Sequence, residues 1–407
     1  MIYKLTNIRV LTNGAMDVIE AGEVLFDENG ILDVGHEVLL REEGFTEIDG
    51  TGLTVLPGMI DSHVHLGMDA SPDPFAKMKD EEPADIAFRA VKQGTEFLEA
   101  GITSVRNLGT RYNADINYRN AVEAGIIVGP RVYASGRPIV MTGGHGHVMA
   151  IEADGRVEVT KAARAQLKAG ADVLKMMATG GVLTKGTDPG AVQLSEEEMR
   201  CICQEAGNLS KTTAAHTIGT EGIKNAIRAG VTTIEHAYML DEEAVELMLE
   251  KGTFLVPTLI APRLILEQPG SIPDHMIKKV EKIIDNHSVS FQMAMEAGVP
   301  IAAGTDAGTP FNFPGLLATE LELMVLNGMS EKEAIRSATI VAAKAVKADA
   351  IIGSIETGKI ADLLIVEGNP LSDIGSLKKP KYVFSSGKLF KKPDDHAVNQ
   401  LHTLKTR

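Results

Sequence analysis

The sequence has few cysteines, and this scarcity narrows the class of protein. The only cysteines among its 407 residues are Cys201 and Cys203, in the segment MRCICQEA. This segment is predicted to be helical, and residues two apart on a helix do not face each other. We therefore expect neither a disulfide nor a cysteine-based metal site. Unpaired thiols fit a reducing compartment, so we expect a cytoplasmic protein.

No segment indicates a membrane or a secretory route. No apolar run approaches the roughly 20 residues that a membrane-spanning helix requires. The N-terminal segment MIYKLTNIRVLTNG alternates like a strand and lacks the pattern of a signal peptide. The net charge of −15 argues against nucleic acid or an anionic membrane as a partner. A phosphate-binding P-loop and the Gly-x-Ser-x-Gly turn of serine hydrolases are also absent from the sequence.

The two ends of the chain predict strands, whereas the middle alternates strands and helices. Residues 1–56 hold short alternating runs separated by the turn-like segments DENG and IDGTG, and the same style returns in IGSIETGKIADLLIVEGNP. We predict a small β-sandwich domain built from residues 1–56 plus 353–390. Residues 57–352 would form the main domain, and residues 391–407 a polar tail.

Eight candidate strands occupy the main domain, each followed by a helical segment. Several of the helical segments end in glycine, which suits the left-handed position that closes a helix. Eight such units favour an α/β fold, the closed (β/α)8 TIM barrel, over an open doubly wound sheet. Active sites of such barrels lie at the carboxyl ends of the strands. The candidate strands are residues 54–65, 102–109, 131–140, 172–181, 212–219, 232–239, 254–259 and 300–308.

Polar side chains gather where these predicted strands end. His63 and His65 lie two apart on a strand and therefore share one face. Neutral imidazole and carboxylate groups are ligands that zinc and neighbouring divalent ions prefer. The complete set predicts a metal site at one end of the barrel. It consists of His63, His65, Lys175, His216, His236 and Asp306.

Lys175 lies among apolar neighbours in DVLKMMATGG. Burial lowers the pKa of a lysine, because it disfavours the charged form. A neutral amine can react with carbon dioxide to give a carbamate, which is an anionic two-oxygen ligand able to bridge two metal ions. The alternative is an ion pair between Lys175 and an aspartate such as Asp306.

These motifs resemble those of the amidohydrolase superfamily in its two-metal form. The resemblance is carried by PGMIDSHVH, the lysine of DVLKMMATGG, AAHTIG, IEHAYM and AAGTDAG, and it extends from about residue 1 to 390. It implies two divalent metal ions, which we expect to be zinc. By this likeness His63 and His65 hold the more buried ion. His216 and His236 hold the second ion, and carboxylated Lys175 bridges the two.

The likeness also implies a hydrolytic mechanism. Two ions roughly 3.5–4 Å apart can hold a bridging hydroxide, which attacks a carbonyl carbon while one ion polarises the carbonyl oxygen. Asp306 would ligate the first ion, take the proton and pass it to the leaving nitrogen. The expected reaction is hydrolysis of an amide bond, with Lys175 and Asp306 among the catalytic groups.

Three further motifs, TGGH, KMMATGGVLTKGTDPG and EHAY, look similar to one subgroup of amidohydrolases. This subgroup contains zinc-dependent Xaa-Pro dipeptidases (prolidases) and arginine or lysine carboxypeptidases, which implies a dipeptide or N-acyl amino acid substrate with a free carboxylate. His145 and Tyr238 are then candidates for catalytic contacts to the carbonyl and carboxylate groups, and His147 is a further substrate-binding candidate. Without this likeness, the two histidines would be assigned to a flexible surface loop and Tyr238 to ordinary packing.

Other functions stay open at this stage. The enzyme alternatives are cyclic amide hydrolysis, as in hydantoinase- or dihydroorotase-like relatives, and an imidazolonepropionase-like reaction. A non-catalytic amidohydrolase-like scaffold is a third alternative, but the intact ligand set argues against it. Deaminase-like members carry His-x-x-Glu after the fifth strand, whereas this sequence has Gly219 in place of the glutamate. We expect a homo-oligomer that acts on a small molecule.

The remaining histidines have polar or helical surroundings in the sequence. We therefore expect them to lie on the surface, outside the site. They are His36, His275, His287, His396 and His402.

Overall fold

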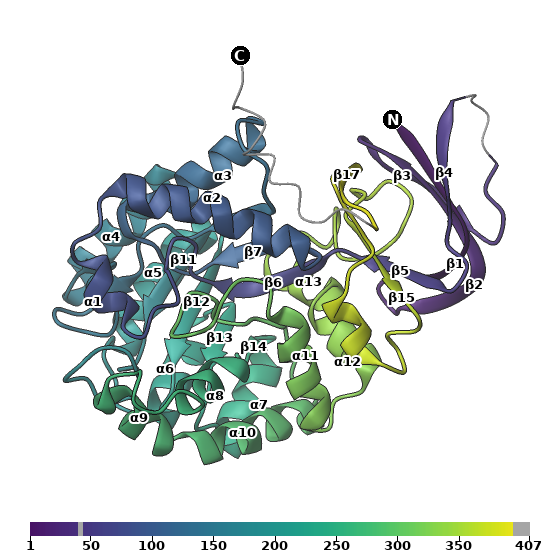
Figure 1. The fold of residues 1–407 in the computed structure, drawn as a ribbon. Coiled ribbons are helices and arrows are strands. Elements are labelled where there is room, and N and C mark those ends of the chain that lie inside the picture. The colour runs from purple at the N-terminus through teal and green to yellow at the C-terminus, as the bar shows by residue number, and fades with distance from the viewer. Residues whose placement is uncertain (40–43, 394–407) are drawn as a thin grey trace.

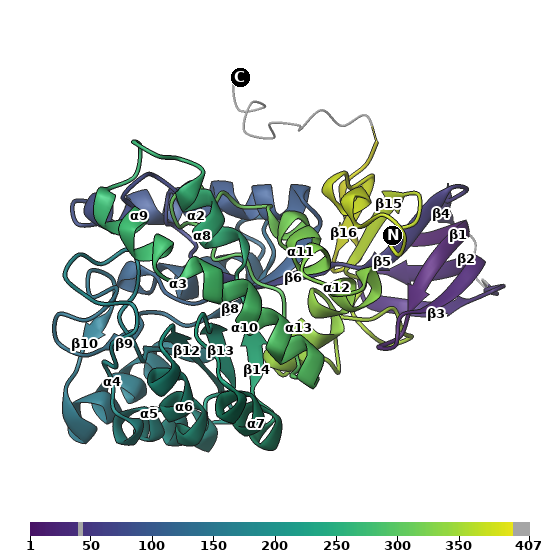
Figure 2. The ribbon, with the colours of Figure 1, turned by 90° about the horizontal axis from the view of Figure 1, so that it is seen from below.

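The computed structural model describes residues 1–39 and 44–393. It contains a barrel surrounded by helices, and strands from the two ends of the chain lie together beside it (Figures 1 and 2). This is the TIM barrel with a terminal β-sandwich that the sequence predicts. Most of the polar tail expected at 391–407, including His396 and His402, lies outside the described residues.

Strands from both chain ends form one sheet in the sandwich. Its order is β17-β16-β15-β5-β1-β2-β3, with β4 paired to β1. Strand β5 pairs in parallel with β1 and antiparallel with β15, so the C-terminal strands join the N-terminal strands directly. The strands are β1 (Ile2–Thr12), β2 (Asp17–Asp27), β3 (Gly30–Gly35), β4 (Phe45–Asp49), β5 (Leu53–Pro57), β15 (Leu363–Glu367), β16 (Tyr382–Ser385) and β17 (Lys388–Lys391).

Three buried aromatic rings connect the two chain ends inside the sandwich. Phe384 of β16 packs edge-to-face against Phe26 of β2, with ring centroids 4.8 Å apart. It also packs edge-to-face against Tyr3 of β1, at 5.0 Å. Because one ring comes from the C-terminal strands and two come from the N-terminal strands, the sandwich core requires both ends of the chain.

The barrel strands pair in parallel and follow chain order, except that the short β10 lies on the other side of β9 from β11. The last position of the ring is taken by residues 301–307, which bridge β14 through Leu255 and Ile301 and β6 through Val64 and Ala307. The predicted strand 131–140 is two short strands, and Gly136 lies between them with a φ of 67°. The strands are β6 (Met59–Val64), β7 (Ile102–Asn107), β8 (Arg131–Ala134), β9 (Ile139–Val140), β10 (Ile151–Glu152), β11 (Val173–Met177), β12 (Thr212–Thr217), β13 (Thr233–His236) and β14 (Phe254–Val256).

Pro57 ends β5 of the sandwich and Met59 begins β6 of the barrel. We therefore propose that the domain boundary on the N-terminal side lies at this point. The backbone N–H of Gly58 donates to Asp362, which comes just before β15. Both crossings between the domains thus lie close together in space.

Helices cover the outside of the barrel. Helices α4, α6, α7 and α10 end at glycines in the left-handed conformation, as the sequence pattern predicts. None of the helices in the described part of the chain has both the length and the apolarity needed to cross a membrane. The helices are α1 (Pro74–Met78), α2 (Pro83–Glu99), α3 (Ala114–Glu123), α4 (Gly155–Ala169), α5 (Glu196–Asn208), α6 (Thr220–Ala229), α7 (Glu242–Lys251), α8 (Ile260–Leu266), α9 (Asp274–Glu281), α10 (Ile284–Ala297), α11 (Leu317–Leu326), α12 (Glu331–Ser337) and α13 (Ile340–Ala345), with short 3-10 turns η1 (Arg111–Asn113) and η2 (Ile374–Lys378).

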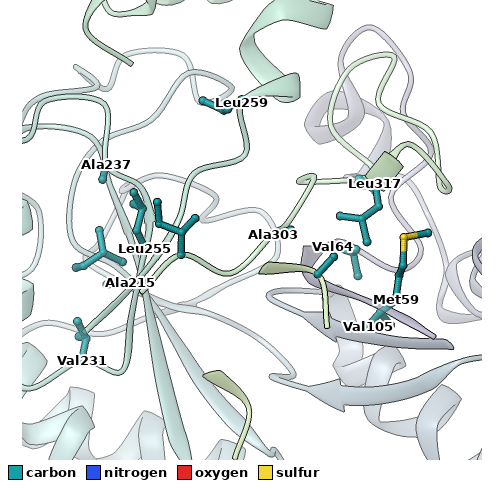
Figure 3. Close-up of a cluster of buried hydrophobic side chains, with 14 of the residues drawn as sticks. Met59, Val64, Val105, Ala215, Val231, Ala237, Leu255, Leu259, Ala303 and Leu317 are labelled. Carbon is teal, nitrogen blue, oxygen red and sulfur yellow. The ribbon is translucent and has the colours of Figure 1, made fainter. Parts of the chain in front are cut away.

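The barrel core is a continuous cluster of buried apolar side chains between strands and helices. Figure 3 shows part of it, with Met59, Val64 and Val105 from neighbouring strands beside Leu317 of α11. Burial of this apolar surface stabilises the barrel as a rigid unit. The strand ends are therefore held in place, and polar groups on them can be positioned accurately.

Truncation of the shared aromatic core should destabilise the sandwich. We expect Phe384→Ala to lower the free energy of unfolding by about 3–5 kcal/mol, because it removes a buried ring and leaves a cavity. The measurement is guanidinium denaturation. The control Leu326→Ala changes a side chain that is 77% exposed and should cost less than about 0.5 kcal/mol. Equal stability of the two variants would contradict a core shared by the chain ends.

Candidate active site

Three predicted ligands meet where the barrel closes. His63 lies on β6 and His65 follows it, and Asp306 lies on the segment that bridges β14 and β6. One atom from each of the three residues lies within 4.8 Å of the others. Asp306 Oδ1 is 3.3 Å from His63 Nε2 and 3.1 Å from His65 Nε2. Two imidazoles and a carboxylate in this arrangement can bind a divalent metal ion.

All six predicted ligands line one cavity, and the other three are His216, His236 and Lys175. His216 lies near the end of β12, and His236 is the last residue of β13. Their ring centroids are 4.6 Å apart. The ring of His236 is in turn 5.0 Å from that of His63. Lys175 reaches the cavity from β11. All six side chains that the sequence singled out therefore surround one space at one end of the barrel.

Hydrogen bonds hold three of the imidazole rings from behind. His63 Nδ1 donates to Glu235 Oε2 at 2.8 Å, His65 Nδ1 to the carbonyl of Gly109 at 3.0 Å. His236 Nδ1 bonds to Thr258 Oγ1 at 2.8 Å. Such partners fix the tautomer of a metal-binding histidine and leave Nε2 free to ligate.

His216 is held through its other nitrogen. Its Nε2 donates to the carbonyl of Gly180 at 3.3 Å, which leaves Nδ1 as the ligand atom. The backbone is unusual at two of the strand ends, since His236 has a φ of 72° and Asp306 a φ of 64°. Positive φ at residues other than glycine is uncommon and concentrates at functional sites.

The charge states of these groups suit metal binding. Burial lowers the pKa of His63 and His216 well below its usual value, and lowers the pKa of His236 to about 4. Burial opposes ionisation of Asp306, but the neighbouring His63, His65 and His236 together outweigh it, and the pKa of this carboxyl lies below its usual value. Neutral imidazole and ionised carboxylate are the forms that bind metal ions.

Lys175 has no partner for its amine. The residue is 1% exposed, and Nζ makes no hydrogen bond to any group in the described part of the chain. The alternative ion pair with Asp306 is therefore not formed. Burial lowers the pKa of Lys175 to about 8. A buried amine without a partner, in a cavity that histidines line, fits conversion to an anionic ligand for two metal ions.

His145 also lines the cavity. It follows β9, and its ring lies 4.4 Å from that of His216. Nδ1 bonds to Thr184 Oγ1 at 3.1 Å, and burial lowers the pKa of His145 to about 3. Gly181 packs against the ring so closely that a Cβ there would come within 2.5 Å of it. The loop of Gly181 and Thr184 therefore sets the position of His145.

His147 has a different position from His145. It is exposed, and its Nδ1 donates to the carbonyl of Gly144 in its own turn at 3.0 Å. It is not among the residues that line the cavity. His147 therefore stabilises the turn, and we give it no part in the proposed reaction.

Tyr238 lines the cavity and is stacked on a histidine that the sequence analysis placed on the surface. The ring centroids of Tyr238 and His287 are 4.0 Å apart, and His287 is buried. The expectation of a surface position for His287 was therefore wrong. His287, Ser290, Phe291 and Ala294 form the buried face of α10. This helical spacing was the available signal for the burial of His287.

Two buried charges behind the cavity were missed. Arg106 of β7 donates to Glu235 Oε1 at 2.9 Å, and neither side chain is exposed. Arg106 also donates to the carbonyl of Ser62 at 2.6 Å and to Thr233 Oγ1 at 2.8 Å. Glu235 in turn holds His63. The signal was a charged residue inside each of two apolar strands, TSVRNL and TTIEHA.

A family model described as the amidohydrolase family matches residues 54–390. This chain belongs to the amidohydrolase family. This chain is 35% identical to ochratoxinase of Aspergillus niger over 371 residues. The alignment covers 83% of this chain and 76% of ochratoxinase. With the ligand-like cluster, the family membership makes this chain a metal-dependent hydrolase.

Solved structures agree with this membership. A Xaa-Pro dipeptidase with methionine bound in its active site superposes with a TM-score of 0.88 and 32% identity, over 96% of this chain and 100% of that one. A prolidase complexed with N-methylphosphonate-L-proline gives a TM-score of 0.89 and 31% identity over the same shares. Ochratoxinase of A. niger gives 0.86 and 30%, over 98% of this chain and 99% of that one.

Removal of the carboxylate behind His63 should weaken metal binding by the amidohydrolase. We expect Glu235→Gln to lower metal affinity about 10–100-fold, because His63 loses the charged partner that orients its ring. The measurement is metal retained during competition with a chelator. Since Arg106 also loses its counter-ion, thermal unfolding is recorded separately. The control Glu250→Gln changes a side chain that is 64% exposed, and equal metal retention in both variants would contradict the role of Glu235.

Proposed function

We propose that this amidohydrolase hydrolyses the amide bond of dipeptides or N-acyl amino acids that carry a free carboxylate. The observation that carries the proposal is the convergence of four histidines, one lysine and one aspartate on a cavity that also contains His145 and Tyr238. The likeness to a Xaa-Pro dipeptidase, a prolidase and ochratoxinase supports this class of substrate.

The residues around the cavity fit two divalent ions, which we expect to be zinc. His63, His65 and Asp306 would hold one ion. His216 and His236 would hold the other. The unpartnered amine of Lys175 would take up carbon dioxide, lose a proton and bridge the two ions as a carbamate. When bound, such ions lower the pKa of a coordinated water to about 7 and polarise the carbonyl group of the substrate.

Asp306 is the proposed general base and acid. Its carboxylate lies beside His63 and His65, at the point where water and substrate would meet. It accepts the proton of the attacking water and delivers that proton to the leaving amide nitrogen. Asp306 N donates to the carbonyl of His63 at 2.8 Å, and this bond holds the segment beside β6.

His145 and Tyr238 are the proposed substrate contacts. With Nδ1 of His145 held by Thr184, its other nitrogen can donate a hydrogen bond to the substrate. The hydroxyl group of Tyr238 is a second donor. A carbonyl oxygen and a free carboxylate are the acceptors that such donors orient.

Loss of the proposed bridging ligand should remove metal and activity together. We expect Lys175→Ala to purify with less than one metal ion per chain and with no measurable amide hydrolysis, since no anionic group remains between the ions. Metal analysis and an assay for released amino acid make the measurement. The control Lys92→Ala changes a lysine that is 78% exposed. A Lys175→Ala enzyme with two ions and full activity would contradict the assignment.

Loss of the tyrosine hydroxyl should affect substrate binding more than turnover. We expect Tyr238→Phe to raise KM about tenfold or more with a smaller change in kcat, because a hydrogen bond to a charged group is lost. Tyr382→Phe, in the sandwich, is the matched control. An unchanged KM would show that Tyr238 only packs against His287.

The proposed reaction is tested with the metal-reconstituted enzyme and a substrate panel. Dipeptides, N-acyl amino acids and cyclic amides are compared by the product released. We expect cleavage of the open-chain amides and little ring opening. Activity confined to cyclic amides would replace this proposal with the hydantoinase-like alternative.

A further inference from the structure

The cavity that the predicted metal ligands line also has two apolar walls. The first, which we call the methionine wall, consists of Met68, Phe75, Met149 and Met177. These residues come from the loop after β6, from α1, from the loop after β9 and from the end of β11. All four are buried members of one apolar cluster. Methionine side chains are flexible and adapt to apolar groups of different shape.

The second wall belongs to a separate apolar cluster. This isoleucine wall consists of Val182, Ile218, Ile265 and Val280. It is built by the loops after β11 and β12 and by helices α8 and α9. Tyr238 belongs to the same cluster, so this wall lies beside one of the two proposed substrate contacts.

The cavity offers no free anionic group to a substrate side chain, among the described residues that line it. Among the described residues that line it, Asp306 is the only carboxylate, and it lies against His63 and His65. A cationic substrate side chain would therefore find no free counter-ion. The nearby ammonium of Lys279 donates to the carbonyls of Gly181 and Thr184 at 2.9 and 2.6 Å, and its charge disfavours a second cation. Burial of a charge without a partner is costly.

We infer that both groups flanking the scissile amide are apolar, so that the substrates are N-acyl or N-aminoacyl derivatives of aliphatic or aromatic amino acids. This inference rests on the proposed function and adds the substrate class. One wall receives the acyl group and the other receives the amino acid side chain, because two separate apolar clusters and the predicted metal ligands line one cavity. Basic side chains, which the arginine or lysine carboxypeptidase alternative requires, are excluded.

The test compares matched substrates on the metal-reconstituted enzyme. N-acetyl-phenylalanine and N-acetyl-leucine are compared with N-acetyl-arginine and N-acetyl-aspartate for the amino acid side. N-benzoyl-phenylalanine is compared with N-succinyl-phenylalanine for the acyl side. We expect kcat/KM to be about tenfold or more higher for each apolar member, since a fully buried apolar side chain contributes at least this factor. Equal kcat/KM for charged and apolar members would overturn the inference.

Leu183 provides a variant that separates this inference from general loss of activity. It is half-buried, lines the cavity and packs against both apolar clusters. We expect Leu183→Glu to lower kcat/KM for N-acetyl-phenylalanine at least about tenfold and to raise the relative rate of N-acetyl-arginine. The control Leu326→Glu places the same charge on an exposed position of α11 and should change neither. If Leu183→Glu does not fold, Leu183→Ala should still reduce the preference for phenylalanine.

A binding measurement distinguishes failure of the inference from failure of the proposed reaction. Calorimetric titration compares N-acetyl-phenylalanine and N-acetyl-arginine as ligands of the metal-reconstituted enzyme. If neither is cleaved but the phenylalanine derivative binds more tightly, the proposed reaction is wrong and the apolar cavity stands. If both are cleaved at equal kcat/KM, amide hydrolysis stands and the apolar substrate class is wrong.

Discussion

Closure of the barrel is the constraint on which the candidate site depends. The segment 301–307 is not a full strand, yet it fits between β14 and β6 through backbone hydrogen bonds. Ser62 N donates to the carbonyl of Ala303 at 2.9 Å, and His65 N donates to that of Ala307 at 2.8 Å. These bonds bring Asp306 to the two histidines of β6, although more than two hundred residues separate them in the chain. Without this closure, the ligand cluster would be two unrelated fragments.

Buried charge around the site is balanced in layers. The imidazoles of His63, His216 and His236 are favoured as neutral groups by burial, and the carboxylate of Asp306 is favoured as an anion by the neighbouring histidines. Behind them, Arg106 and Glu235 form a buried ion pair. Arg106 also donates to the carbonyl of Ser62, and Glu235 accepts from His63. Lys175 is the exception, because its amine has no partner in the described part of the chain. This imbalance is what makes a bridging anionic form of Lys175 chemically reasonable.

The loops after the barrel strands line the cavity and hold His145 in place. Thr184 and Gly181 hold His145 against the ring of His216. The same loop contributes Val182 and Leu183 to the apolar lining, and Lys279 of α9 holds that loop by its carbonyls. A single segment thus positions a proposed substrate contact and sets the polarity of the space beside it. In the proposed function, substrate choice and the position of His145 therefore depend on the same loop.

Local pattern in the sequence determined the strand–helix alternation, the composition of both chain ends and the six polar residues at strand ends. These features are readable because a strand places alternate side chains on one face, and because parallel strands bring their carboxyl ends to one side. Only the tertiary structure decided which groups stand behind the ligands, that Tyr238 is the ring stacked on His287, and that His147 bonds within its own turn. It also decided the two apolar walls, whose members come from seven separate loops and helices and from the end of β11. Contacts of this kind depend on side-chain packing between distant segments, and no local pattern encodes them.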